Sequence, residues 1–122
     1  MVKIVIGGQM GKEEIKKDLL ELIGDEEVDI EIKNDLDAAM TIQNGEADYY
    51  IGACETGAGG ALAMATALLG STKTVTIASP SKMLSEEQIA DEIKNKGKVA
   101  FGFTINTKDE VLPKLAKYLV AN

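Results

Sequence analysis

The residues whose types and spacing point most directly to chemistry lie between Ala53 and Gly60, in the order Ala-Cys-Glu-Thr-Gly-Ala-Gly-Gly. Cys54 is the sole cysteine of the chain; it ends an apolar run and precedes a nearly uncharged run of small residues. This order predicts a strand, then a glycine-rich loop, then a helix. In α/β proteins such a loop is where ligands bind, so Cys54 is a candidate catalytic residue.

The loop also has the features of a cradle for an anion. Glycines let the backbone approach a ligand closely, and the first amides of a following helix would point at it. The helix dipole favours negative charge there and would favour the thiolate form of Cys54, whereas an inward-pointing Glu55 would oppose both effects. The residues expected to bind a ligand in this loop are Cys54, Glu55, Thr56, Gly57, Gly59 and Gly60.

Two other interpretations of the same residues remain open. Gly57, Ala61 and Ala65 fall on one face of the expected helix, so the small residues are also explained by close packing. A buried lone cysteine often behaves as a small hydrophobic residue. The loop has no Gly-Lys-Ser/Thr of a P-loop, and the Gly-x-Gly-x-x-Gly fingerprint of dinucleotide sites would have to follow the first strand.

Strand and helix patterns alternate along the whole chain, which positions this loop. The expected strands cover residues 2–6, 28–32, 48–54, 74–78 and 98–103. The expected helices cover residues 12–23, 34–43 and 57–69, a segment that begins at 85, and a last segment that ends near 122. This alternation predicts a single α/β domain over residues 1–122: a three-layer, Rossmann-like α/β/α sandwich around a five-stranded, mainly parallel sheet.

The strand patterns also predict part of the strand order. Residues 48–54 are continuously apolar, which is typical of a central parallel strand, whereas residues 28–32 alternate strictly, which favours an edge. We therefore expect the order to begin 2-1-3. Gly24, Asn34 and Ser85 are expected to stop or cap helices, and Pro113 indicates that the last helix either starts late or kinks.

The other strand ends add candidate binding residues, because the carboxyl ends of parallel strands share one edge of the sheet. We expect Gly8 and Gln9 after the first strand, and Ser79, Ser81 and Lys82 after the fourth, to contact a ligand. The alternatives are a tight turn at Gly8 and a solvated surface lysine at Lys82.

The last strand brings residues 104–107, which begin with Thr104, to the same edge. Other residues near the strand ends have simpler structural interpretations. Asp35 and Asp37 are interpreted as charges at a helix N-terminus, and Tyr49 and Tyr50 as sheet residues.

The amino-acid composition argues against several classes of function for this chain. The chain has 122 residues, a net charge of −7, 13 lysines, and neither arginine nor histidine. The acidic balance disfavours nucleic-acid binding, and no spacing of ligating residues indicates a metal or another cofactor. The apolar runs are too short for a membrane span, and one cysteine cannot form an internal disulfide. We expect a cytoplasmic protein, and the uncharged segment 57–69 favours a homodimer or larger homo-oligomer.

Four segments resemble the YhfU-like family of bacterial proteins, a family of unknown function. They are Ile4–Gln9, Gly45–Tyr50, Cys54–Ala65 and Lys98–Thr104. This resemblance covers nearly the whole chain and implies no activity.

The first seventy or so residues are also similar to the ribose-5-phosphate isomerase B and galactose-6-phosphate isomerase family. The matching positions are Gly45–Asp48, Cys54, Thr56, Gly57 and Gly59. The resemblance implies that Cys54 is the base, and that Thr56 with the Gly57 and Gly59 amides holds the developing enediolate. The chain departs from that family at Gln9-Met10, where the family has an Asp-His pair, and at Glu55, which replaces a glycine.

Three hypotheses follow. The first is a protein that binds a small polar or anionic metabolite, such as a sugar phosphate or a carboxylate, at the strand carboxyl ends. The second is an isomerase-like enzyme with Cys54 as base, and the third is a non-catalytic subunit of a metabolic complex.

Overall fold

A computed structural model describes residues 1–55 and 60–120 of the chain. The strands are β1 (Val2–Gly8), β2 (Val28–Ile32), β3 (Tyr49–Cys54), β4 (Thr74–Ser79), β5 (Lys82–Met83) and β6 (Ala100–Thr104). The α-helices are α1 (Lys12–Ile23), α2 (Asp35–Gln43), α3 (Ala63–Leu69), α4 (Glu86–Lys94) and α5 (Lys108–Leu119). Two short 3-10 helices, η1 (Gly60–Leu62) and η2 (Ile105–Thr107), precede α3 and α5.

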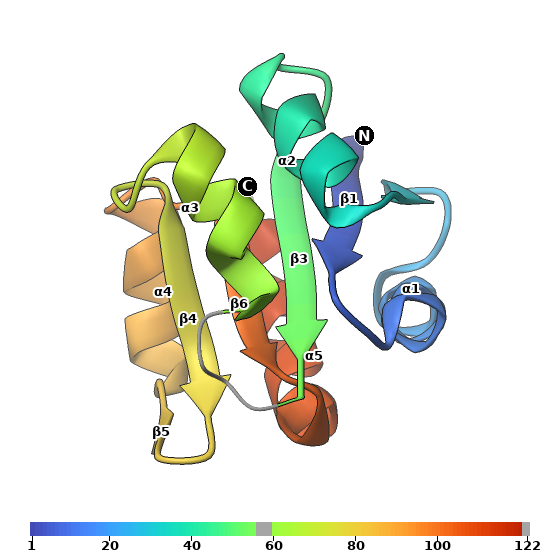
Figure 1. The fold of residues 1–122 in the computed structure, drawn as a ribbon. Coiled ribbons are helices and arrows are strands. Elements are labelled where there is room, and N and C mark those ends of the chain that lie inside the picture. Colours follow the sequence, from blue (N-terminus) through green and yellow to red (C-terminus); the bar gives the residue numbers. More distant parts are fainter. Residues whose placement is uncertain (56–59, 121–122) are drawn as a thin grey trace.

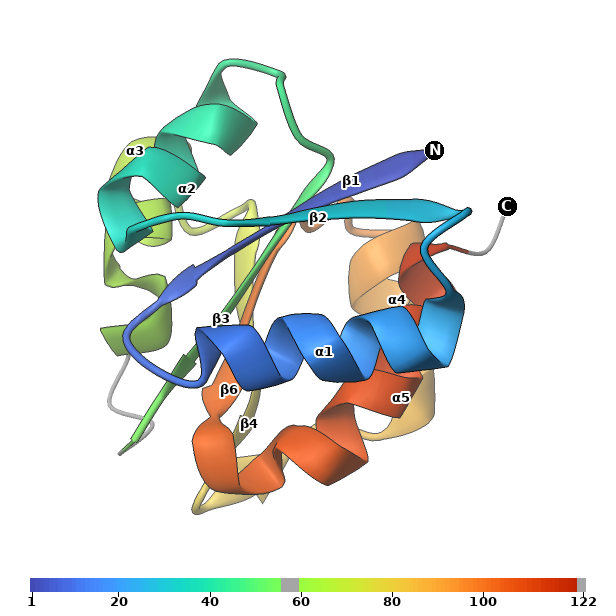
Figure 2. The same ribbon diagram turned by 90° about the vertical axis from the view of Figure 1, so that its right-hand side faces the viewer.

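The sheet has the order β2-β1-β3-β6-β4-β5. Its first five strands run parallel, so the α/β fold class, the 2-1-3 start and the edge position of β2 are confirmed. Helices α2 and α3 cover one face, and α1, α4 and α5 cover the other, as the two views in Figures 1 and 2 show. The carboxyl ends of the parallel strands point to one edge, which lies at the bottom of Figure 1.

The prediction of five strands was one short. β5 has two residues and pairs antiparallel with the end of β4, through Ala78–Met83 and Ser79–Lys82. Two residues are too few to produce a recognisable alternation, so the sequence could not reveal this strand.

The helix boundaries follow the predicted capping residues. Gly24 ends α1 with φ 93°, and its amide donates to the Leu20 carbonyl at 2.8 Å. The Asn34 side chain caps α2, and Ser85 with Gln88 forms the expected capping box of α4. α5 starts five residues before Pro113 and continues through it, so of the two alternatives the late start is wrong.

The third helix differs more from expectation. Among the described residues, the segment begins with the 3-10 helix η1, and the α-helix α3 starts at Ala63 and has seven residues. Ala61 and Ala65 are buried against the sheet, which confirms the packing role of the small residues at these positions. Ala63 and Met64 are exposed on the outer face.

Candidate functional site

Two buried side chains meet at the carboxyl ends of β3 and β6. Cys54 is paired in register with Thr104, and both are buried. Each lies two residues after a glycine of its strand, so both side chains are on the face of the sheet that α2 and α3 cover. Within the described part of the chain the Thr104 Oγ1 has no hydrogen-bond partner. A buried hydroxyl without a partner is costly, which makes it a candidate for contact with a ligand.

A row of three glycines lies beneath this site. Gly7, Gly52 and Gly102 are paired in register across β1, β3 and β6. A Cβ at Gly52 would stand 2.8 Å from the Ala61 carbonyl oxygen, and a Cβ at Gly102 would stand 2.6 Å from Leu62 Cγ. The glycines therefore let η1 rest directly on the sheet beside Cys54.

The turn after β1 lies next to the end of β3 and contacts η1. Gly8 has φ 77°, and the Gln9 amide donates to the Ala53 carbonyl at 3.0 Å. The Gln9 side-chain amide lies against Gly60, where an added Cβ would stand 2.9 Å from both its terminal atoms. Gly8 thus ends β1 with a left-handed backbone, and the Gln9 side chain lies beside Gly60; ligand contact at these residues stays a prediction.

The segment between β1 and α1 also contacts the residue that follows β6. A Cβ at Gly11 would stand 2.3 Å from Ile105 Cδ1, which follows β6. Two contacts therefore flank the end of β3. One is between Gln9 and Gly60, and the other is between Gly11 and Ile105.

Tyr50 and Asp35 form a polar network that sequence reasoning missed. The fully buried Tyr50 donates from its hydroxyl to Asp35 Oδ1 and also lies 2.9 Å from the Ala61 carbonyl oxygen. The Gly8 amide donates to the same Asp35 oxygen at 3.2 Å. Burial, and then the Asp35 hydrogen bond, raise the pKa of Tyr50 well above its ordinary value. The sequence carried no signal for this network, because Asp35 and Tyr50 each have an ordinary local role.

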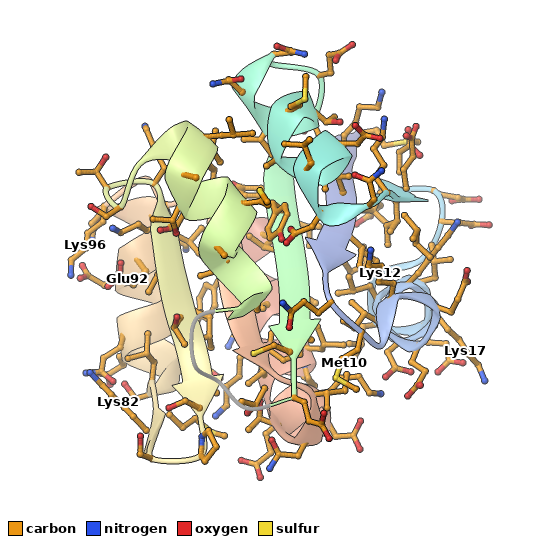
Figure 3. The ribbon with its side chains drawn as sticks, in the orientation of Figure 1. Met10, Lys12, Lys17, Lys82, Glu92 and Lys96 are labelled. Carbon is orange, nitrogen blue, oxygen red and sulfur yellow. The ribbon has the colours of Figure 1, made fainter. Side chains whose placement is uncertain are left out.

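The remaining predicted binding residues do not join this cluster. Glu55 is exposed. Ser79, Ser81 and Lys82 form the tip of the β4–β5 hairpin, where the Ser79 and Ser81 hydroxyls are 3.4 Å apart. Lys82 is exposed there, on the far side of the sheet edge from Met10 (Figure 3). Thr56, Gly57 and Gly59 lie outside the described residues.

The α-helix of the third helical segment begins later than expected. The expected helix N-terminus at Gly57 was to supply outward-pointing amides, but the α-helix begins at Ala63 behind the buried residues of η1. Thr56, Gly57 and Gly59 lie outside the described residues, so their amides as a cradle for an anion stay a prediction. The expectation of a thiolate at Cys54 rested on that helix end and stays a prediction.

A second unpartnered buried atom lies elsewhere, at Glu92 Oε2 on α4. The residue Glu92 lines an open groove of about 620 Å³ together with Lys82, Asp91 and Lys96. The other oxygen of this carboxylate is 3.1 Å from the Lys96 ammonium, so its charge already has a cationic partner. Figure 3 shows Glu92 and Lys96 close together at the outer side of α4, remote from the end of β1.

A groove of about 140 Å³ between β1, β2 and α2 is lined by neither Cys54 nor Thr104. Four of its five charged residues form two ion pairs, Lys3 with Asp29 at 3.9 Å and Lys33 with Glu31 at 3.7 Å. Neighbouring charges that neutralise each other in solvent are typical of an ordinary surface.

Chemically, the cluster at Cys54 offers a thiol, a hydroxyl and the Gln9 amide. These groups donate and accept hydrogen bonds, and the thiol can also exchange a proton. Among residues 1–55 and 60–120, no group of three or more Cys, Asp and Glu side chains is placed to hold a metal ion. None of the described helices is long and apolar enough to cross a membrane.

Comparison with known proteins assigns the chain to a family. The family model described as "Protein of unknown function DUF2620" matches residues 2–119. The chain belongs to the DUF2620 family. Relatives similar to the chain include the "Uncharacterized protein YhfU" of Escherichia coli K12 and that of Shigella flexneri. Each is 42% identical over 119 residues, which cover 98% of this chain and 99% of the relative.

This result confirms the resemblance to the YhfU-like family. No solved structure matches the chain.

Proposed function

We propose that this protein binds a small polar metabolite at the carboxyl ends of β1, β3 and β6, with Cys54 and Thr104 as the central contacts. The observation that carries the proposal is the Thr104 hydroxyl, which is fully buried and has no hydrogen-bond partner among the described residues. A ligand oxygen or nitrogen at this position would give the hydroxyl the partner that it lacks. Strand carboxyl ends are also the usual location of ligands in α/β sheets.

The neighbouring groups indicate what kind of ligand fits. Thr104, Cys54 and Gln9 are uncharged hydrogen-bonding residues, and Lys82 lies at the separate β4–β5 tip. Recognition would therefore rest on hydrogen bonds to hydroxyl, carbonyl or carboxylate oxygens. Sugar phosphates, sugars and small carboxylates form the test panel.

Thermal unfolding with this panel tests the proposal, with Thr104→Val as the decisive variant. Valine keeps the shape of the side chain and removes the hydroxyl. We expect a compound that raises the Tm of the wild type to lose this effect in T104V. We also expect it to keep its effect in Lys82→Ala, the control at the same edge. A ligand at a hundred times its Kd stabilises a protein by about 2.7 kcal/mol, which is readily measured.

The proposal is wrong if a compound stabilises the wild type and T104V equally, because the hydroxyl would then make no contact. It is also wrong if no compound of the panel stabilises the wild type. Without ligand, T104V should be as stable as the wild type or more stable by up to about 1 kcal/mol, since it removes an unpaired buried hydroxyl.

An isomerase-like enzyme is the second candidate, favoured by a buried thiol at the end of the central strand beside Thr104. In this mechanism the Cys54 thiolate would take a proton from one carbon of a hydroxy-carbonyl substrate and return it to the neighbouring carbon. The resemblance to sugar-phosphate isomerases motivates this role. Full turnover by Cys54→Ala on an identified substrate would exclude it.

Assembly and location belong to the same proposal. Leu36, Met40 and Met64 are more than 40% exposed on α2 and α3, and this apolar face favours a homodimer or larger homo-oligomer over a monomer. Light scattering of the wild type and of Met64→Lys tests this assembly, which the variant should weaken.

Association with a different protein, as a non-catalytic subunit, would appear as a mixed complex in size-exclusion chromatography. A lone cysteine fits a cytoplasmic location, and the net charge of −7 argues against a nucleic-acid partner.

A further inference from the structure

We infer that Tyr50 is the positioning residue of the proposed binding site: its hydroxyl fixes the two chain segments on either side of Cys54. This inference rests on the proposed function for its biological meaning. The contacts themselves are independent of any ligand.

The ring of Tyr50 is held on the glycine row. It is fully buried, and a Cβ at Gly7 would stand 2.5 Å from its Cε2 atom. A Cβ at Gly52 would stand 3.1 Å from its Cε1 atom. The ring therefore has one position, between β1 and η1, from which the hydroxyl reaches out of the sheet.

The hydroxyl joins the two segments that flank Cys54. On one side it bonds Asp35, whose same oxygen accepts from the Gly8 amide and so fixes the turn after β1. On the other side the same hydroxyl donates to the Ala61 carbonyl oxygen at 2.9 Å, so its single proton is shared by the two acceptors and ties η1 to the same network. The two segments then touch directly, through Gln9 against Gly60.

Loss of the hydroxyl would act on these segments and not on the sheet. Phenylalanine would keep the ring and its packing on Gly7 and Gly52. The Asp35 and Ala61 oxygens would lose their shared partner, so the Gly8 turn and η1 would separate more easily. We therefore expect local opening around Cys54 to become more frequent in Tyr50→Phe while global packing is largely retained.

The sole cysteine makes this opening measurable without a ligand. Alkylation of Cys54 by iodoacetamide, followed by mass spectrometry over a series of urea concentrations, separates two routes. Local opening gives a rate that hardly depends on urea, and global unfolding gives a rate that rises steeply with urea. We expect Y50F to raise the urea-independent rate about tenfold, the effect of a lost hydrogen bond to a charged group.

Matched controls isolate the hydroxyl. Tyr49→Phe removes a neighbouring hydroxyl on the other face of β3, where the Tyr49 ring packs beside Phe101, and should leave the urea-independent rate unchanged. Asp35→Ala removes the same hydrogen bond from its other end and should raise this rate as Y50F does. Asp37→Ala, which removes a charge from the same helix turn, should not.

Three results would overturn the inference. The first is a Y50F effect confined to the urea-dependent rate, which would make Tyr50 an ordinary core residue. The second is an equal effect of Y49F. The third is a wild-type rate as fast as that of the unfolded chain, because Cys54 would then not be held closed. Failure of the ligand screen together with the expected alkylation rates would overturn the proposed function and leave the positioning role intact.

Discussion

The two faces of the sheet differ in what they bury. The face under α1, α4 and α5 packs large apolar side chains such as Ile51, Phe101 and Leu115. The face under α2 and α3 holds a smaller apolar cluster around Tyr50, with the glycine row and the Cys54–Thr104 pair at its carboxyl end. Large side chains stabilise the first face, whereas glycines on the second let η1 and polar groups approach the sheet. The difference indicates a division between stability and the proposed site.

The largest effect is expected from a cavity on the first face. Leu115 is fully buried in α5, so Leu115→Ala should lower the free energy of unfolding by about 2–5 kcal/mol. Urea denaturation measures this loss. The thermal shift caused by a panel compound should persist in L115A at temperatures where the variant is folded. Loss of ligand binding in folded L115A would contradict the division between the two faces.

An added methyl group on the second face should have a smaller effect on stability and a larger effect on the site. Gly52→Ala places a Cβ against the Ala61 backbone oxygen, and overpacking of this kind costs about 1–3 kcal/mol. Because η1 must shift, G52A should also abolish the ligand-induced Tm shift. Gly102→Ala places its Cβ 2.6 Å from Leu62 Cγ, an atom of a side chain and not of the backbone, so a change of the Leu62 side-chain torsions can relieve part of the contact and the loss of stability should be smaller. Equal losses in the two variants would show that η1 is not seated on the backbone of the sheet.

The smallest expected effect is a difference between the wild type and Y50F in how the free energy of unfolding depends on pH. The folded protein keeps the Tyr50 proton to a higher pH than the unfolded chain does, because the pKa of Tyr50 is raised. Its contribution to stability is complete below the unfolded pKa of about 10 and declines above it, by up to about 1.4 kcal/mol per pH unit. Urea denaturation at pH 9 and pH 11 should show a steeper decline for the wild type than for Y50F. Parallel declines would mean that Tyr50 ionises equally easily in both states.

Much of the fold could be predicted from the sequence because its signals are local. The apolar alternation of residues 28–32, the continuous apolar run before Cys54 and the Ser85–Gln88 capping box each depend on a few neighbouring residues. The order 2-1-3 followed from the same patterns. β5 escaped prediction because two residues carry no periodicity, and η1 because a 3-10 turn and an α-helix share the same small residues.

The site was predicted only in part, because its contacts are not local. Cys54, Gln9, Gly8 and Gly60 were identified from strand ends, and Thr104 was placed at the same edge without being singled out. Its pairing with Cys54 depends on β6 lying beside β3, which sequence order does not reveal. The hydrogen bond between Tyr50 and Asp35 could not be predicted, because Tyr50 is explained as an ordinary strand residue and Asp35 as an ordinary charge at a helix N-terminus. Lys82 was grouped with the site because all strand ends were treated alike.

A crystal structure of the protein with a compound from the thermal-shift panel tests the central claim most directly. The account predicts a ligand oxygen or nitrogen within hydrogen-bond distance of Thr104 Oγ1, beside the Cys54 sulfur and close to the Gln9 side chain. A ligand seated instead at the Ser79–Lys82 tip or in the groove beside Glu92, with the Thr104 hydroxyl unchanged, would contradict it.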